Sequence, residues 1–143
     1  MVSLGQRRAL VAAVDTSALL AIASSRDQFH ARAVETAKRF HGAGGRWLGS
    51  ALVIGELHAH LLHRISAVTA RRVVSALLND PAYEWHDVTI ELERTAVHQW
   101  LERFADQDFS LTNAVTFELM SQERVRKAFA FDNDFVVAGF ELL

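Results

Sequence analysis

The sequence of 143 residues contains no cysteine, a single proline and only two lysines. Without cysteine the chain cannot form disulfides, thiolate metal sites or a cysteine nucleophile, and this composition fits a reducing compartment such as the cytoplasm. One proline and seven glycines leave little material for a flexible linker. Half of the residues are apolar and 22% are charged, which is enough for a hydrophobic core. We therefore expect one globular domain over residues 1–143.

The sequence also lacks an uninterrupted apolar run long enough to cross a bilayer, which takes roughly 20 residues. Its start resembles a secretory signal, because two arginines precede a mostly apolar segment. Asp15 interrupts that segment, however, and a charge at the centre of a translocated segment costs about 2.5–3.5 kcal/mol. The pattern instead favours a buried strand that ends at Asp15, followed by a helix, in a soluble protein without membrane contact.

Short apolar runs alternate with segments of helical periodicity along the chain. We expect strands over residues 9–15, 47–49, 83–88, 127–132 and 140–143. We expect helices directly after Asp15 and over residues 27–41, 51–64, 69–78, 91–104 and 110–122, the last with Ser110 as its N-cap. This alternation predicts an α/β protein: a three-layer α/β/α sandwich around a central, mostly parallel sheet.

Charge is unevenly distributed along the chain. Residues 1–72 carry a net charge of +6 and residues 73–143 a net charge of −8. All basic residues except Lys38 and Lys127 are arginines, whose planar guanidinium group suits phosphate oxygens. Two interpretations remain open from charge alone: an anionic ligand held near a cluster of carboxylates, or surface charges that neutralise one another across the fold.

Carboxylates end two of the apolar runs. Asp15 ends the first run and Asp132 ends the fourth, and in open α/β sheets ligands bind outside the carboxyl ends of the strands. Asp134 follows Asp132 at the i+2 spacing, so both face the same way if the chain stays extended. Glu56 lies next to the apolar side of the helix expected over residues 51–64. It is either a site residue or a partly exposed surface glutamate.

Four short motifs in this order resemble the PIN-domain ribonucleases, and among them the VapC-type toxins of bacterial toxin–antitoxin pairs. The motifs are Val-Asp15-Thr-Ser-Ala, Gly55-Glu56-Leu, Asp108-Phe-Ser-Leu-Thr-Asn113-Ala and Ala-Phe-Asp132-Asn-Asp134-Phe. The resemblance implies an endoribonuclease that depends on Mg²⁺ or Mn²⁺. It implies that the catalytic and metal-binding residues are Asp15, Glu56, Asn113 and Asp132, with Asp134, Thr16 and Asp108 as secondary candidates. It also implies an RNA substrate, a homodimer and a cognate VapB-type antitoxin whose C-terminal segment covers the acidic groove.

The chemistry requires such a cluster of carboxylates independently of the resemblance. Phosphodiester hydrolysis needs an activated water and neutralisation of charge on the phosphate, and divalent ions supply both. Mg²⁺ is typically held by one or two carboxylates together with waters and substrate phosphate. Carboxylates that share a pocket without metal raise one another's pKa values. The hypothesis therefore requires that Asp15, Glu56 and Asp132 meet at one point.

Position 113 departs from the family pattern, which has aspartate where this chain has Asn113. Asparagine still offers a carbonyl oxygen, but one negative charge is missing, and two unit charges 4 Å apart interact by about 4 kcal/mol at an effective dielectric constant of 20. We therefore predict weak metal binding and low activity, unless Asp108 compensates from its loop. A naturally weakened nuclease, a pseudoenzyme and an inactivating substitution remain open. The alternative function is a catalytically silent PIN-like module that binds RNA or a protein partner.

Three arginines are candidates for contacts with RNA phosphates: Arg64, Arg71 and Arg72. They equally suit the ends and the solvated faces of helices. The three tryptophans, Trp47, Trp85 and Trp100, are expected in the core or in a dimer interface rather than as platforms for bases.

Histidines follow Glu56 in the same helix. Glu56, His60 and His63 fall at i, i+4 and i+7, a spacing that a zinc site would use, although the HExxH order is absent. A solvated or RNA-facing strip of histidines is the simpler interpretation. A receiver-like phosphoacceptor domain that uses Asp15 is a further alternative, but it lacks a lysine at the end of a strand.

Overall fold

The computed structural model describes residues 10–143. Within this part of the chain, five parallel strands form one sheet in the order β3-β2-β1-β4-β5. The strands are β1 (Val11–Val14), β2 (Arg46–Ser50), β3 (Tyr83–His86), β4 (Lys127–Phe129) and β5 (Glu141–Leu142). Because all neighbours are parallel, the carboxyl ends of the central strands β1 and β4 lie side by side at one edge of the sheet.

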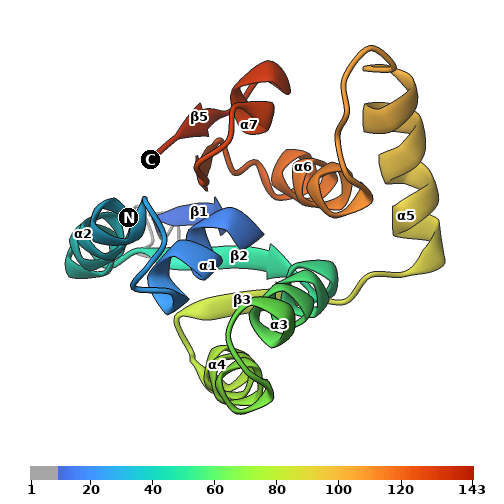
Figure 1. Ribbon diagram of the computed structural model, residues 1–143. Helices are drawn as coiled ribbons and strands as arrows, with labels where there is room; N and C mark the ends of the chain where they lie inside the picture. The colour runs from blue at the N-terminus through green and yellow to red at the C-terminus, as the bar shows by residue number, and fades with distance from the viewer. Residues whose placement is uncertain (1–9) are drawn as a thin grey trace.

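Helices connect the strands and cover both faces of the sheet (Figure 1). Four of them precede β3: α1 (Thr16–Ala23), α2 (His30–Gly42), α3 (Ala51–Arg64) and α4 (Ala67–Asn79). After β3 come α5 (Ile90–Ala96), its π-helical continuation η2 (Val97–Glu102), α6 (Leu111–Glu123) and α7 (Asp134–Val137). Figure 1 shows α3 and α4 on one side of the sheet and α5 and α6 on the other. The predicted α/β/α sandwich is therefore confirmed, with a fully parallel sheet.

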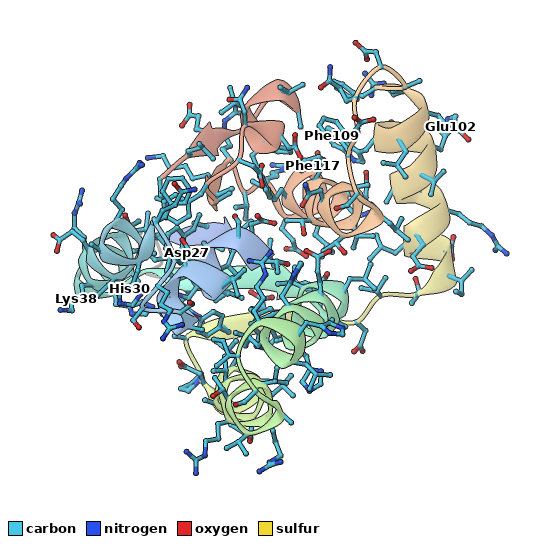
Figure 2. All side chains as sticks on the ribbon, in the orientation of Figure 1. Asp27, His30, Lys38, Glu102, Phe109 and Phe117 are labelled. Atoms are coloured by element: carbon cyan, nitrogen blue, oxygen red, sulfur yellow. The ribbon has the colours of Figure 1, made fainter. Side chains whose placement is uncertain are left out.

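Successive residues of the central strands contribute to two separate cores, because side chains in a strand point alternately to opposite faces. Ala12 and Val14 pack with the core between the sheet and α1 to α4, whereas Ala13 packs with the core beneath α6. In the second core, the Phe109 and Phe117 rings meet edge to face at 5.1 Å between their centres, and Figure 2 shows them together beside α6. Burial on both faces explains why the first strand reads as a continuous apolar run.

The predicted elements lie close to the observed ones. The helix expected over residues 51–64 is α3 with the same bounds, and Ser110 caps α6 by accepting a hydrogen bond from the Asn113 backbone N–H (3.0 Å). The helix expected over residues 91–104 is divided into α5 and η2. Residue 9, the expected start of the first strand, lies outside the described residues. Within residues 10–143, every helix is too short or too polar to span a bilayer.

The tryptophans occupy the two cores. Trp47 is 1% exposed in the core under α1 to α4, Trp85 packs partly buried against the same core, and Trp100 packs partly buried against the core under α6.

The fourth strand is shorter than predicted, and the chain turns before Asp132. β4 ends at Phe129, and the Phe131 backbone N–H donates to the Ser17 hydroxyl (3.2 Å). Asp132 Oδ1 then accepts from the Asp134 backbone N–H (3.0 Å), and α7 begins at Asp134. The extended chain that would make Asp132 and Asp134 face the same way is therefore not present: the two residues are joined by a turn that the Asp132 side chain stabilises.

Candidate functional site

Asp15 lies at the carboxyl end of β1, where it caps α1. The first N–H groups of a helix have no partner within the helix, and an aspartate at the N-cap supplies one. Asp15 Oδ2 accepts from the Ser17 backbone N–H (3.2 Å) and from the Ser17 hydroxyl (2.5 Å). The side chain is only 3% exposed, so its carboxylate is held in a fixed orientation in a nearly dry environment.

Asp132 approaches Asp15 from the segment that follows the neighbouring strand β4. The Ser17 hydroxyl that donates to Asp15 also accepts the Phe131 N–H, so one side chain ties the segment after β4 to the end of β1. Burial is the largest cause that raises the pKa of Asp15 to about 7; the Asp132 carboxylate raises it further, while the hydrogen bonds from Ser17 lower it. A raised pKa is the effect expected where carboxylates share a pocket.

Asn113 and Asp134 form the side of the site that α6 and α7 contribute. Asn113 is 8% exposed, and its Nδ2 group donates to Asp134 Oδ2 (3.2 Å). This bond leaves the amide oxygen Oδ1, which can accept a hydrogen bond or ligate a cation, without a hydrogen-bond partner among residues 10–143. Burial and the Asp132 carboxylate raise the pKa of Asp134, whereas the hydrogen bond from Asn113 lowers it.

A cavity of about 430 Å³ lies at this edge of the sheet. The four residues that the sequence indicated most strongly all line it: Asp15, Glu56, Asn113 and Asp132. Thr16 lines the cavity as well. Glu56 comes from α3, together with His60 and Arg64, which lie one and two turns further along the same helix. The structure thus brings together side chains from three elements and one loop that are far apart in the sequence.

Other sequence candidates lie away from the cavity wall. Asp108 is exposed in the loop before α6, where its charge contributes to the raised pKa of Asp134. Arg71 lines a separate groove between α3 and α4, and Arg72 is exposed on α4. Of the three arginines that were candidates for RNA contacts, Arg64 lines the cavity.

Sequence reasoning named Thr16 as a secondary candidate but missed Ser50, Asp27 and Arg26. Thr16 Oγ1 and Ser50 Oγ are buried side-chain oxygens without a hydrogen-bond partner among residues 10–143. Thr16 begins α1 directly after β1, and Ser50 is the N-cap of α3 at the end of β2. The position of Ser50 at the carboxyl end of a strand was therefore a sequence signal for a residue near the site. A second groove of about 680 Å³ shares Asp27 and Arg64 with the cavity and adds Arg26. Figure 2 shows Asp27 beside α1, next to α2.

The donor atoms of the cavity suit Mg²⁺ or Mn²⁺ better than zinc. They are carboxylate, amide and hydroxyl oxygens, the ligands that hard cations prefer. Within the described chain, no three side chains from His, Asp and Glu are grouped closely enough to hold an ion by themselves. This holds for Glu56, His60 and His63, the set with zinc spacing, of which His60 lines the cavity and His63 is exposed. It holds equally for Asp15, Glu56 and Asp132, which line one cavity without meeting at one point. Mg²⁺ needs only one or two carboxylates, because it keeps several waters.

Comparisons with known proteins give a consistent result. No protein-family model matches the chain. Its curated relatives include the 23S rRNA-specific endonuclease VapC20 from two strains of Mycobacterium tuberculosis. Each is 32% identical over 128 residues, which cover 89% of this chain and 93% of the relative.

Solved structures share the fold. The crystal structure of Mycobacterium tuberculosis VapC20, a toxin that cleaves the sarcin–ricin loop, matches with a TM-score of 0.79 at 29% identity and covers 91% of this chain and 95% of that chain. VapBC2 from Rickettsia felis, bound to promoter DNA, matches with a TM-score of 0.64 at 10% identity (94% and 98% covered). FitAcB from Neisseria gonorrhoeae matches with a TM-score of 0.62 at 11% identity (94% and 96% covered). The last two show the fold alone.

Proposed function

This chain belongs to the VapC family of PIN-domain toxins, and on that premise we propose that it is an endoribonuclease that depends on Mg²⁺ or Mn²⁺. One observation carries the proposal: Asp15, Glu56, Asn113 and Asp132 line a single cavity at the carboxyl ends of β1 and β4. The relative VapC20 is named for its action on 23S rRNA, so ribosomal RNA in the cytoplasm is the substrate to test first.

The proposed metal ligands are Asp15, Glu56, Asn113 and Asp132, which all line the cavity, with Asp134 as an outer support. At neutral pH a buried carboxyl with a pKa of about 7 is half protonated, and a bound cation favours its ionised form. When bound, a divalent ion supplies the positive charge that activates water and offsets the charge of the phosphate. The missing carboxylate at position 113 supports the expectation of weak metal affinity.

Hydrogen bonds hold the proposed ligands in place before any ligand binds. Ser17 orients Asp15, and the Asp134 backbone N–H orients Asp132. Asn113 is fixed from two sides, by the Ser110 cap and by Asp134. Such fixed orientation lowers the cost of reaching the geometry that catalysis requires. The buried Thr16 hydroxyl is free to donate to a phosphate oxygen or a water in the cavity.

Cationic side chains on one wall support a path for the RNA backbone. Arg64 lines the cavity, and the adjoining groove continues from Arg64 to Arg26. We propose that phosphates on one side of the scissile bond contact Arg64 and Arg26, because phosphate contacts position a nucleic acid without reading its sequence. Arg71 and Arg72 on α4 remain proposed contacts for more distant phosphates.

Exposed apolar side chains on α3 and α4, of which Leu62 and Leu78 line one groove, support an interaction with protein partners. Leu62 and Ile65 at the end of α3 and Val68 and Leu78 on α4 are each between 43% and 55% exposed. Gathered apolar side chains on a surface are typical of protein interfaces. The proposed partners are a second copy of the chain and a VapB-type antitoxin, as expected for the toxin of a VapBC pair.

RNA cleavage tests the proposal directly. The purified protein should cut a hairpin of the sarcin–ricin type, or ribosomal RNA, in Mn²⁺ and not in EDTA. Asp15→Ala and Asp132→Asn should abolish cleavage, while Asp87→Asn, which changes an exposed carboxylate elsewhere, should leave it unchanged. A protein that binds RNA but cuts none in Mn²⁺ or Mg²⁺ would favour the silent module, for which Asn113 is the specific observation.

A further inference from the structure

An aromatic pair forms part of the cavity wall beside the acidic residues. The rings of Phe29 and Phe131 are stacked in parallel, with centres 4.7 Å apart and planes inclined by 1°. Phe29 lies in the connection from α1 to α2, and Phe131 directly precedes Asp132. Both line the cavity that holds Asp15, and both are only partly buried. Both rings also pack against the core under α1 to α4, and the parts of the rings that line the cavity are open to a ligand.

The backbone on both sides of the pair is held in place. The Phe131 N–H donates to the Ser17 hydroxyl, which in turn donates to Asp15. The Phe29 N–H donates to Asp27 Oδ1 (2.8 Å), and Asp27 also lines the cavity. The Phe131 ring further meets Phe129 edge to face at 5.9 Å. The pair is therefore a preorganised surface, and its position is fixed relative to Asp15 and Asp132.

Positive charge adjoins the pair. The Arg32 guanidinium lies 5.8 Å from the centre of the Phe29 ring and 5.5 Å from that of Phe131, within the range of cation–π attraction. His60 and Arg64 line the same cavity. The cavity thus combines carboxylates, the Arg64 guanidinium and the rings of two phenylalanines, with Arg32 beside those rings. A nucleotide has the matching parts, because its charged phosphate is joined to a flat base with two π faces.

We propose that Phe29 and Phe131 form a nucleobase-stacking subsite that holds a base next to the scissile phosphate. This inference rests on the proposed function, since it assigns a place to one nucleotide of the RNA. Stacking on aromatic rings tolerates any base, so the subsite anchors the strand and does not select a sequence. Loss of one stacked base typically weakens binding by about 5- to 150-fold.

A thermodynamic cycle tests the subsite: it compares the effect of a substitution in the protein with the effect of removing a base from the ligand on the binding affinity. The ligand is a 2′-O-methylated ApA dinucleotide, which contains one phosphodiester, compared with two versions that each lack one base. Affinities are measured by NMR titration in Mg²⁺. For the wild-type protein, removal of one of the two bases, the one that occupies the subsite, should weaken binding of the dinucleotide about 10-fold. Phe29→Leu should bind the intact dinucleotide about 10-fold more weakly and should lose nothing further when that base is removed.

Matched variants separate stacking from a structural role. Phe29→Tyr keeps an aromatic face and should retain the penalty for base removal, and Phe131→Leu should repeat the result of Phe29→Leu. Phe104→Leu changes a partly buried phenylalanine that packs on Trp100 and Phe109 instead, and should behave as the wild type. Circular dichroism confirms that each variant is folded. Equal penalties for base removal in the wild type and in Phe29→Leu would overturn the subsite.

Failure of the stacking subsite and failure of the proposed nuclease function give different results. If the base penalty depends on Phe29 while no RNA is cleaved in Mn²⁺, the subsite stands and the nuclease proposal fails. If RNA is cleaved and the penalty is independent of Phe29, only the subsite fails. Absence of any binding of the dinucleotide in Mg²⁺ would also overturn the subsite.

Discussion

Replacement of Asp15 by asparagine should stabilise the protein at neutral pH in the absence of divalent ions. Asp15 is 3% exposed, and its pKa is raised from 3.8 to about 7, chiefly by burial, with the Asp132 carboxylate adding to the effect. Asparagine has nearly the same shape, keeps an oxygen that accepts from the Ser17 N–H, and carries no charge. The substitution therefore removes the free-energy cost of ionising a buried group beside a second carboxylate.

The sign and size of the effect follow from proton linkage. A carboxyl whose pKa is higher in the folded state binds more protons when folded, so the free energy of unfolding falls as the pH rises from about 4 to about 7. The difference between 3.8 and about 7 corresponds to about 4 kcal/mol over the whole range, to about 2 kcal/mol between pH 5 and 7, and to about 3 kcal/mol between pH 5 and 8. For a chain of this size, about 3 kcal/mol corresponds to roughly 10 °C in Tm.

Unfolding by urea or heat in EDTA, at several pH values from 5 to 8, measures this difference. The gap in stability between Asp15→Asn and the wild type should widen by up to about 3 kcal/mol as the pH rises. Asp87→Asn removes an exposed carboxylate and should keep a constant gap. A constant gap for Asp15→Asn would refute the reasoning, because Asp15 would then ionise in the folded protein as easily as in the unfolded chain.

Further predictions concern the effect of Mn²⁺ on stability and the effects of substitutions at Asn113, Gly49 and Gly55. Mn²⁺ should raise the Tm of the wild type by mass action and leave Asp15→Ala unchanged, as measured by thermal shift. Asn113→Asp should tighten Mn²⁺ binding about 10-fold or more in calorimetry and increase RNA cleavage on gels; no gain in either would contradict the role of this position. Gly49→Ala places a Cβ atom 2.4 Å from the Trp85 ring and should cost about 1–3 kcal/mol in urea unfolding. Gly55→Ala in α3, where nothing lies within 4 Å, should instead stabilise the protein by up to about 1 kcal/mol.

Local patterns were sufficient to predict most of the fold. The run before Asp15 contains Ala12, Ala13 and Val14, which are fully buried on alternate faces of a central strand, so the whole run had to be apolar. The helical period of residues 51–64 places Val53, Leu57 and Leu61 on one buried side. Glu56 lies beside that side and not opposite it, so spacing left open a site residue or a partly exposed surface glutamate; the structure places it, partly exposed, on the cavity wall.

Contacts between distant segments decided what could not be predicted. The apolar pattern continues through Phe131, yet that residue leaves the strand ladder because its N–H bonds to Ser17, 114 residues away in sequence. No local signal reveals such a bond. For the same reason, Phe29 and Arg26 escaped notice: the connection from α1 to α2 reaches the cavity only through the packing of these two helices.

The asparagine at position 113 links the stability of the metal-free protein to its affinity for metal. Asn113 Nδ2 donates to Asp134, whose pKa the Asp132 carboxylate already raises, and an aspartate at 113 would replace that donor by a further negative charge. Asn113→Asp should therefore lower stability in EDTA at pH 7.5, by the same repulsion that a divalent ion would relieve. The gain in Mn²⁺ affinity and the loss of metal-free stability must appear together. A variant that shows only the gain would mean that position 113 lies outside the electrostatic reach of Asp132 and Asp134.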